Sequence, residues 1–402
     1  MSIRIRALTV DEHATFNTPI LDAFGLRPHP ERTEAEKAMP ELDVRFGAFD
    51  GPKLVGAAGA FNVQMSTPGG SVATSGLTRV AVSSTHRRQG ILRALMRRHL
   101  DDARARQQPV AALWASEGQI YGRFGYGLAV LRQALSVERD RSAFAGEPEA
   151  PASARALDED EAVALIPPIY EQARRSTPGM LSRSEAWWRI RRLHEWSPSD
   201  EGPLHRVILS FDGVPEAYVL YRLRHRWDEL MMPTGSVSVL EAIGLSPRGT
   251  RAAWRFLFDI DLMKRIEAQI LPTDHPLLLL ATEPRRLGLR TADAVFLRVL
   301  DVPAALAARG YGADHRLTLR LADEFYPDVA GTYTLERGVA KRSDDSPDLA
   351  LHIRALGSVY LGGFTWRQLA EAGQVSELRE GAIARADALF RADRAPWCPE
   401  VF

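Results

Sequence analysis

Two arginines and a glycine stand where a predicted strand turns into a predicted helix, within the stretch VAVSSTHRRQGILRALM at residues 80–96. The first turn of a helix presents unpaired N–H groups and the positive end of the helix dipole, a combination that binds phosphate groups. Gly90 has no Cβ, so the backbone there can approach a ligand closely. Arg87 and Arg88 add charged hydrogen-bond donors. The pattern therefore predicts a pyrophosphate site; the open alternative is an ordinary basic helix start on the surface.

The strand before this turn offers a second binding element. Val80 and Val82 share one face of the strand, with Ala81 between them. The backbone groups of such a strand can pair with an extended ligand arm that contains amides, as an edge strand pairs with a peptide. The turn lacks the pattern G-x-x-x-x-G-K-[ST], which excludes a Walker-type nucleotide loop.

A tyrosine lies in a second informative stretch, ASEGQIYGRFGYG at residues 115–127. A phenol is a suitable proton donor to a departing thiolate, because the two ordinary pKa values lie within about 2 units of each other. This chemistry makes the two tyrosines of the stretch, Tyr121 and Tyr126, candidates for such a donor, and the hydroxyl of Ser116 can hydrogen-bond a ligand nearby. Two alternatives stay open: Tyr121 packs in the core, or Tyr126, which follows Gly125, is the functional phenol.

The elements around these stretches alternate between strand and helix and predict a mixed α/β fold. A change of composition at residues 141–156, rich in Ala, Pro, Glu and Ser, is typical of a linker. A further change near residue 301 leads us to expect three domains, at 1–142, 143–298 and 299–402. Expected strands lie at 1–10, 45–49, 53–61, 76–82, 110–114, 317–321 and 349–353, and expected helices at 88–106, 158–175, 250–266 and 376–390.

A faint internal repeat suggests that part of the fold is duplicated. The tripeptide Phe-Asp-Gly precedes a strand at 49–51 and again at 211–213, and the strand-to-helix stretch at 80–83 lines up with 243–246. Aligning Val82 with Leu245 puts Ala253 opposite Gly90 and Trp254 opposite Ile91, so side chains would crowd a pyrophosphate there. We therefore expect the second copy to be structural; the alternative is coincidence among short turn signals.

Composition narrows the class of protein. The 402 residues carry a formal net charge of zero, which gives no support for a nucleic-acid or anionic-membrane partner. A single cysteine, Cys398, excludes an internal disulfide and a Cys-based zinc cluster, and the histidines show no ligand spacing, so we expect no metal. Residues 1–10 lack a signal-peptide core, and the apolar run 277–281 is too short for a membrane span. We expect a cytoplasmic protein, with secretion by a non-classical route not excluded.

The R-x-x-G turn after V-x-V resembles the acetyl-CoA signature of the GNAT superfamily, Q/R-x-x-G-x-G/A, with Leu92 in place of the usual small residue. The whole chain resembles the enhanced intracellular survival (Eis) family of aminoglycoside and lysine N-acetyltransferases. The features that carry this resemblance are the length of the chain, the stretches VAVSSTHRRQGIL and SEGQIYGRFGYG, and the final phenylalanine. The resemblance implies two tandem GNAT-like domains, the second degenerate, and a sterol-carrier-protein-like α/β domain. It also implies a homohexamer.

The resemblance assigns roles to residues by position. It makes Tyr121 the general acid and the α-carboxylate of Phe402 the general base, where the open alternative is a frayed tail. Arg79 stands where the family usually has an aromatic residue, which bears on the choice of acceptor. The resemblance leaves two rival functions, a protein-lysine N-acetyltransferase and a non-catalytic CoA-binding scaffold. Implied acetyl-CoA ligands are Val80, Ala81, Val82, Arg87, Arg88, Gly90, Ile91 and Ser116, and implied acceptor residues are Asp22, Phe24 and Glu400.

Overall fold

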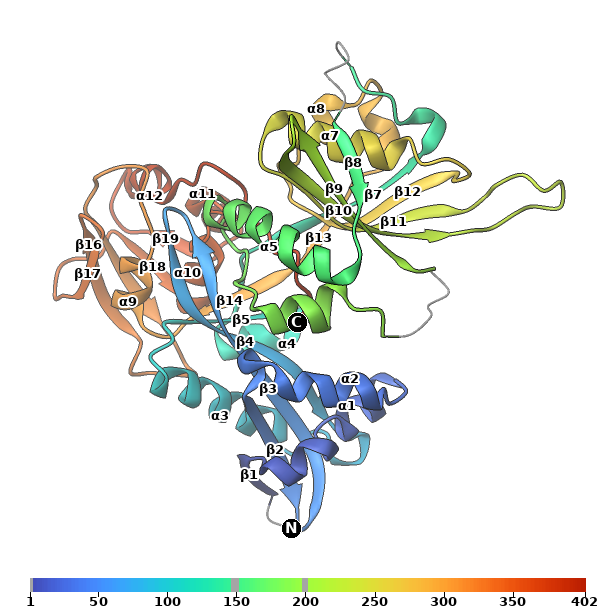
Figure 1. Cartoon of the computed structure of the whole chain (residues 1–402). Helices are drawn as coiled ribbons and strands as arrows, with labels where there is room; N and C mark the ends of the chain where they lie inside the picture. Colours follow the sequence, from blue (N-terminus) through green and yellow to red (C-terminus); the bar gives the residue numbers. More distant parts are fainter. Residues whose placement is uncertain (1–2, 146–151, 197–201) are drawn as a thin grey trace. The chain divides into compact units, whose positions relative to one another are not determined.

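The computed structural model describes residues 3–145, 152–196 and 202–402 (Figure 1). The chain divides into two compact units. The first contains the chain up to Val130, Ala294–Pro396 and Glu400–Phe402, and the second contains Leu131–Asp293 and Trp397–Pro399. Three sheets form the framework, two in the first unit and one in the second. No helix in the described ranges is both long and apolar enough to cross a membrane.

The first sheet carries the phosphate-binding turn predicted from the sequence. Strand β4 pairs in parallel with β5, and the other neighbouring strands of this sheet pair antiparallel. The helices of this region are α1 (Thr18–Phe24), α2 (Pro30–Ala35) and α3 (Ile91–Ala105). The strand order is β1 (Ile3–Ala7), β2 (Val44–Asp50), β3 (Lys53–Thr67), β4 (Gly70–Val82), β5 (Val110–Trp114), β14 (Val295–Val299) and β6 (Gly127–Leu128).

Helices α1 and α3 cover opposite faces of the first sheet, because successive residues of a strand point to opposite sides. A Cβ at Gly56 of β3 would meet Ile91 of α3 at 3.2 Å. A Cβ at Gly59 would instead meet Phe16, just before α1, at 3.1 Å. The face of the sheet that carries α3 is therefore the α3 face, and the opposite one is the α1 face.

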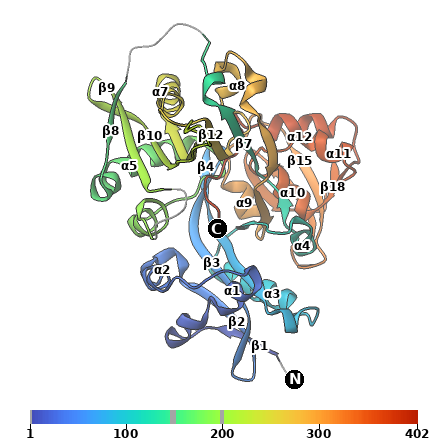
Figure 2. The same ribbon diagram turned by 90° about the vertical axis from the view of Figure 1, so that its right-hand side faces the viewer.

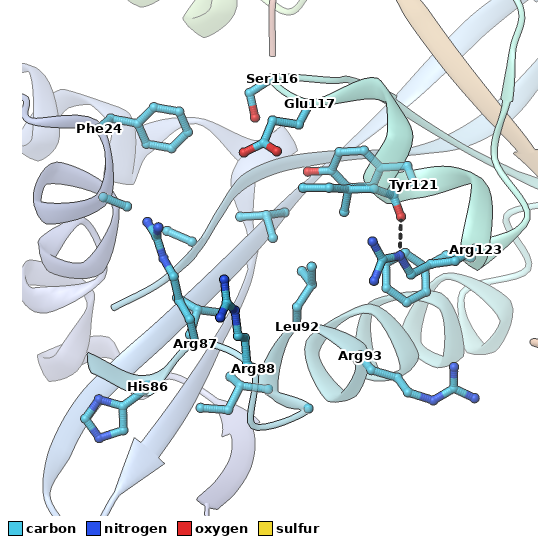
Figure 3. A pocket seen from close by; sticks show the side chains of 18 residues that line it. Phe24, His86, Arg87, Arg88, Leu92, Arg93, Ser116, Glu117, Tyr121 and Arg123 are labelled. Carbon is cyan, nitrogen blue, oxygen red and sulfur yellow. Dashed lines mark hydrogen bonds between the residues drawn. The ribbon is translucent and has the colours of Figure 1, made fainter. Parts of the chain in front are cut away.

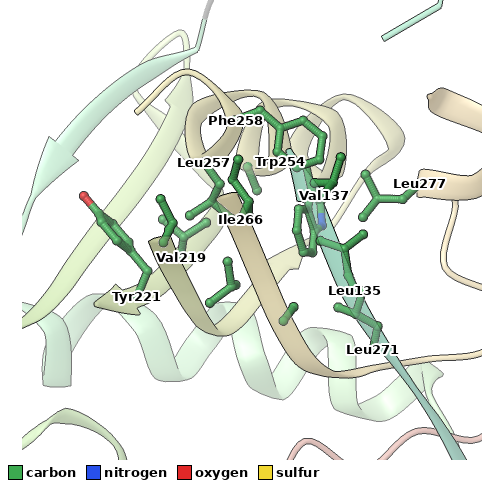
Figure 4. Packing of buried hydrophobic residues seen from close by; sticks show 14 of the residues in the cluster. Leu135, Val137, Val219, Tyr221, Trp254, Leu257, Phe258, Ile266, Leu271 and Leu277 are labelled. Atoms are coloured by element: carbon green, nitrogen blue, oxygen red, sulfur yellow. The ribbon is translucent and has the colours of Figure 1, made fainter. Parts of the chain in front are cut away.

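The second sheet forms the core of the second unit. Helices α5 (Glu159–Ser176) and α7 (Pro247–Phe258) lie on either side of strand β10 (Figure 2). Val219 packs with the α7 residues Trp254 and Leu257 (Figure 4). Tyr218 and Leu220 belong instead to the cluster that contains residues of α5. The strand order is β13 (Arg290–Asp293), β7 (Leu131–Glu138), β12 (Arg265–Leu271), β11 (Ser236–Gly244), β10 (Val214–Arg224), β9 (Leu204–Phe211) and β8 (Ser153–Ala156).

The first two sheets each contain a strand that the sequence analysis assigned to the neighbouring domain. Strand β7 belongs to the second sheet although it precedes residue 142, and most of β14 precedes residue 299 but lies in the first sheet. A division into three consecutive segments, at 1–142, 143–298 and 299–402, therefore does not account for this exchange of strands between the first two sheets. They stay a proposal for the order of domains along the chain.

The third sheet forms a smaller domain inside the first unit. Its interior is filled by large side chains, among them Tyr360, Trp366 and Phe390. The buried guanidinium of Arg309 donates to the carbonyls of Tyr360 at 2.8 Å and Phe390 at 2.9 Å. Its strands run β17 (Val339–Arg342), β16 (Gly331–Glu336), β15 (Leu317–Ala322), β18 (Leu349–His352) and β19 (Val375–Glu377), with helices α9 (Val302–Ala307), α10 (Ile353–Val359), α11 (Trp366–Glu371) and α12 (Ala382–Phe390).

Most expected elements are present, but several boundaries differ. Helix α3 begins at Ile91 and not at residue 88, because Arg88 and Gly90 have positive φ values of 63° and 80°. The expected helix at 250–266 ends at Phe258, and the chain then enters strand β12. The closing helix begins at Ala382, after the strand β19. In the expected linker, 153–156 form strand β8, while 146–151 lie outside the described residues.

The internal repeat is confirmed as a repeated arrangement of elements. The turns at Gly51 and Gly213 close the hairpins β2–β3 and β9–β10, and both β4 and β11 lead into a helix. The alignment of Ala253 with Gly90 is wrong, however. Helix α7 starts at Pro247, so Ala253 lies in its second turn and is buried in the core.

The second copy differs at the turn that would hold a phosphate. Eight residues separate β4 from α3, whereas only Leu245 and Ser246 separate β11 from α7. A Cβ at Gly244 would lie 2.2 Å from the backbone nitrogen of Thr250, so strand and helix are in direct contact. The Ser246 hydroxyl accepts the Gly249 N–H at 3.0 Å. The α7 N-terminus is therefore closed by its own chain, which agrees with a structural role.

Candidate active site

Strand β4 departs from β5 at the site predicted from the sequence. The ladder between the two strands ends at the pair Leu77 and Leu113, although β4 continues to Val82. A β-bulge lies just beyond this pair, where Arg79 and Val80 oppose a single residue of β3, and Arg79 has a φ of 55°. A bulge bends its strand and increases the local twist. The end of β4 therefore presents backbone groups that β5 does not pair.

The turn after β4 leaves the first N–H groups of helix α3 without a side-chain cap. Helices α5, α7 and α11 are capped by the side chains of Asp158, Ser246 and Thr365, whereas the N-cap of α3 is Gly90. A Cβ at Gly90 would meet no protein atom within 4 Å. The glycine is therefore required by its φ of 80°, and the space in front of it is open. This geometry suits an anion such as a pyrophosphate.

A cavity of about 640 Å³ extends from this turn. Figure 3 shows Arg87 and Arg88 on one side of it and Tyr121 on the other. Both arginines are exposed, whereas Val80 and Val82 are half-buried. Among the residues assigned by position, the lining contains Phe24, Val80, Ala81, Val82, Arg87, Arg88, Gly90, Ile91, Ser116 and Tyr121.

Of the two candidate phenols, Tyr121 lines the cavity and Tyr126 does not. Tyr121 ends helix α4 (Gly118–Tyr121), lines the cavity and is 7 % exposed. Burial, and secondarily the charge of Glu117, raises the pKa of Tyr121 above its ordinary value. Tyr126 does not line the cavity; its hydroxyl faces the buried ring of His99, 3.4 Å from Nε2. Burial lowers the pKa of His99 to about 3, so this ring is neutral. Tyr121 is therefore the phenol available to a ligand.

The positive charge that Arg79 brings to the α1 face is neutralised within the fold. The Arg79 guanidinium donates to Asn17 Oδ1 at 3.2 Å and forms an ion pair with the buried carboxylate of Glu36. Glu36 also accepts from Arg32 Nε at 3.3 Å. Asp22 and Phe24 both lie on α1 and are both exposed. Phe24 lines the cavity, whereas Asp22 does not. Of the two early acceptor candidates, only Phe24 is placed at the cavity.

The end of the chain is packed, so the alternative of a frayed tail is wrong. Glu400 is 1 % exposed and Phe402 is 9 % exposed. A Cβ at Gly76 of β4 would lie 3.2 Å from the Phe402 ring, and Gly76 points to the same face as Thr78, which pairs with Gly59. The terminal ring therefore lies on the α1 face of the first sheet, beside the strand that leads to the cavity. Neither Glu400 nor Phe402 is part of the cavity lining itself.

Sequence reasoning missed several residues of the lining. Glu117, Ile120 and Arg123 belong to the turn around Tyr121, and a helical reading of that turn would have grouped them with it. Arg93 lies in the first turn of α3, and His86, interpreted as a turn residue, also lines the cavity. In the described part of the chain, no three His, Cys, Asp or Glu side chains gather as a metal site. The absence of a metal stays a prediction.

Comparison with known proteins agrees with this geometry. Models of the acetyltransferase (GNAT) domain match residues 4–129 and 179–299, and a model of the sterol carrier protein domain matches 302–399. An uncharacterized N-acetyltransferase of Streptomyces avermitilis is 37% identical over 416 residues, covering 100% of both chains. N-acetyltransferase Eis of Mycobacterium tuberculosis is 34% identical over 386 residues, covering 90% of each chain. The crystal structure of Eis1 from Mycobacterium abscessus superposes with a TM-score of 0.86 at 32% identity, covering 100% of both chains.

We expect replacement of both Arg87 and Arg88 by methionine to weaken the binding of CoA about 10- to 100-fold, because two charged donors to a pyrophosphate are lost. Isothermal titration with CoA measures this directly. The matched control is Arg98→Met, because Arg98 lies on the same helix but stacks over Phe46 at 5.2 Å and does not line the cavity. Equal affinity in the double variant and the wild type would contradict the assignment of the phosphate site.

Proposed function

Because the chain belongs to the Eis-type family of GNAT N-acetyltransferases, we propose that it acetylates primary amines of aminoglycosides or other polyamines, by direct attack of the amine on acetyl-CoA in a ternary complex. The observation that carries the proposal is the uncapped N-terminus of α3, which opens on a cavity that also contains Tyr121. A homohexamer and a cytoplasmic location are part of the same proposal and rest on the resemblance to the family and, for the location, on the sequence.

The cavity supplies groups for each part of the cosubstrate. The N–H groups at the start of α3, with Arg87 and Arg88, hold the pyrophosphate. The end of β4, with Val80 and Val82, pairs with the amides of the extended arm as an added strand would. An N–H group of this strand polarises the thioester carbonyl, where negative charge develops during attack.

Tyr121 provides a proton to the sulfur when the thioester bond breaks. The amine nitrogen forms a bond to the carbonyl carbon, the carbon–sulfur bond breaks, and the thiolate takes the phenolic proton. The raised pKa of Tyr121 keeps the phenol protonated throughout the neutral range. Its placement across the cavity from Arg87 and Arg88 leaves room between them for the arm that ends in the thioester (Figure 3).

The α-carboxylate of Phe402 accepts the proton that the attacking amine loses, directly or through water. An α-carboxyl group has an ordinary pKa of about 3.5 and is ionised at neutral pH. The packed ring of Phe402 fixes the chain end on the α1 face, and Glu400 in the same tail is buried as well. Phe24, 52 % exposed at the cavity, and Asp22 extend the acceptor side along α1.

We expect acetyl-CoA to release free CoA when mixed with the protein and an aminoglycoside or a polyamine, measured by a thiol reagent. The same assay with a lysine peptide separates the two rival functions from the proposal. Faster release with the peptide than with any small amine would favour a protein-lysine acetyltransferase. Tight CoA binding without release above the amine-free rate would favour a scaffold.

We expect Tyr121→Phe to lower kcat by about 10²-fold or more, because the departing thiolate loses its proton donor. An acid must be protonated to act, so activity falls as pH rises through its pKa. Because burial raises that pKa, the alkaline limb of the wild-type profile lies above the ordinary pKa of a phenol. Tyr126→Phe is the matched control, since its hydroxyl faces His99 and not the cavity. Similar kcat values in the two variants would remove the role of Tyr121.

We expect two glycines added after Phe402 to lower kcat by about 10²-fold, because the carboxylate moves by up to about 7 Å. Steady-state kinetics with a saturating amine measure the loss. The control is Val401→Ser, which keeps the chain length and changes a residue that is 54 % exposed. Wild-type turnover in the extended chain would exclude the terminal carboxylate as the base.

A further inference from the structure

A short segment of the third domain lies against two elements of the candidate active site, helix α3 and the turn around Tyr121. Residues 323–328, DEFYPD, follow strand β15 and contact both helix α3 and the turn that follows Tyr121. All of these residues belong to the first unit. The segment is outside the cavity, and the reaction described above does not use it.

The segment is joined to the Tyr121 turn through Arg298, which forms a buried ion pair with Asp323. Arg298 of β14 and Asp323 of the segment have fully buried side chains and form a charged hydrogen bond. The other arm of the Arg298 guanidinium donates to the carbonyl of Phe124 at 2.6 Å. Phe124 lines the cavity and follows Tyr121 by three residues. Removing one partner of a buried charge pair strongly destabilises the fold around it, because the other charge stays buried without a partner.

The backbone of the turn is shaped around this guanidinium. A Cβ at Gly125 would lie 1.5 Å from Nη1 of Arg298, and Gly125 has a φ of 81°. Any side chain at this position would displace Arg298. The glycine that follows Phe124 therefore admits the arginine that fixes the turn.

The contact with α3 uses the next two residues of the segment. The N–H groups of Phe325 and Tyr326 donate to Asp323 Oδ1 at 3.0 Å and 2.9 Å, so the ion pair also orders the segment itself. The carbonyl of Phe325 accepts from Arg97 Nη2 at 2.6 Å, and the hydroxyl of Tyr326 donates to Asp101. Both partners lie on α3.

Aromatic contacts complete the connection between the two parts. The ring of Phe325 meets the ring of Phe124 edge to face, with centroids 5.2 Å apart. The guanidinium groups of Arg93 and Arg97 lie 4.9 Å and 4.5 Å from the centre of the Phe325 ring. Phe325 thus contacts both the Tyr121 turn and the helix whose N-terminus faces the cavity.

We propose that Arg298 and the segment 323–328 form a clamp that fixes the Tyr121 turn against helix α3, so that the sterol-carrier-like domain is a positioning part of the acetyltransferase site. The catalytic half of this inference rests on the proposed function. Arg298 and Asp323 are positioning residues, because they touch neither the cavity nor a reacting atom. A displacement of about 1 Å in a reacting geometry costs up to about 10²-fold in rate.

The test compares Arg298→Met and the isosteric Asp323→Asn with Arg309→Met in the full-length protein. Arg309 is also a buried arginine, but within the described residues its guanidinium donates to carbonyls of the third domain alone. Acetyl transfer to the best amine of the panel gives kcat and KM for acetyl-CoA. Hydrogen–deuterium exchange of residues 116–126 reports the order of the turn without any reaction.

We expect the clamp variants to lose about 10- to 100-fold in kcat with little change in KM, and to exchange faster at 116–126. Combined with Tyr121→Phe, Arg298→Met is expected to cost less than about threefold more, because the two changes act on one group. Arg309→Met is expected to change neither quantity. Losses that add to that of Tyr121→Phe, or equal exchange in Arg309→Met, would overturn the clamp. A wild type that acetylates no amine would refute the proposed function, and the exchange rates would still decide whether the turn is clamped.

Discussion

The N-terminus of helix α3 is the constraint on which the site depends. Peptide N–H groups at a helix start need partners, and α5, α7 and α11 obtain them from their own side chains. Helix α3 begins at a glycine in the left-handed conformation, with open space in front of it. The uncapped donors, the two arginines and the end of β4 that β5 does not pair then all face the same cavity. This arrangement favours a ligand with a pyrophosphate and an amide-containing arm.

The duplicated fold shows how the same arrangement loses such a site. In the second sheet the turn is two residues long, Gly244 is in direct contact with the start of α7, and the Ser246 hydroxyl occupies the helix N-terminus. A helix end that is capped by its own side chain gains stability and offers fewer donors to a ligand. The length of this turn therefore distinguishes a helix start that opens on a cavity from one that is closed by its own chain.

The third domain is connected to the site by the buried ion pair of Arg298 with Asp323 and by the ring contact of Phe325 with Phe124. Its interior is occupied by aromatic side chains and by Arg309, whereas its segment 323–328 reaches α3 and, through Arg298, the Tyr121 turn. The packed end of the chain brings Phe402 to the α1 face of the first sheet. In this interpretation the carrier-like domain contributes to acetyl transfer twice, through the clamp and through the carboxylate at its C-terminus.

Local sequence determined the elements whose causes are local. The strand before the turn, the arginines and Gly90 were predicted from spacing, because glycine conformations and phosphate-binding helix starts depend on neighbouring residues. Tyr121 was chosen by the resemblance of its segment to the family. Only the tertiary structure placed β7 and β14 in each other's sheets, closed the second turn and brought Asp323 to Arg298. It also ended α7 at Phe258, where helical periodicity alone had continued to residue 266. Strand pairing and buried charge pairs join residues far apart in the chain, and no periodicity along the sequence records such contacts.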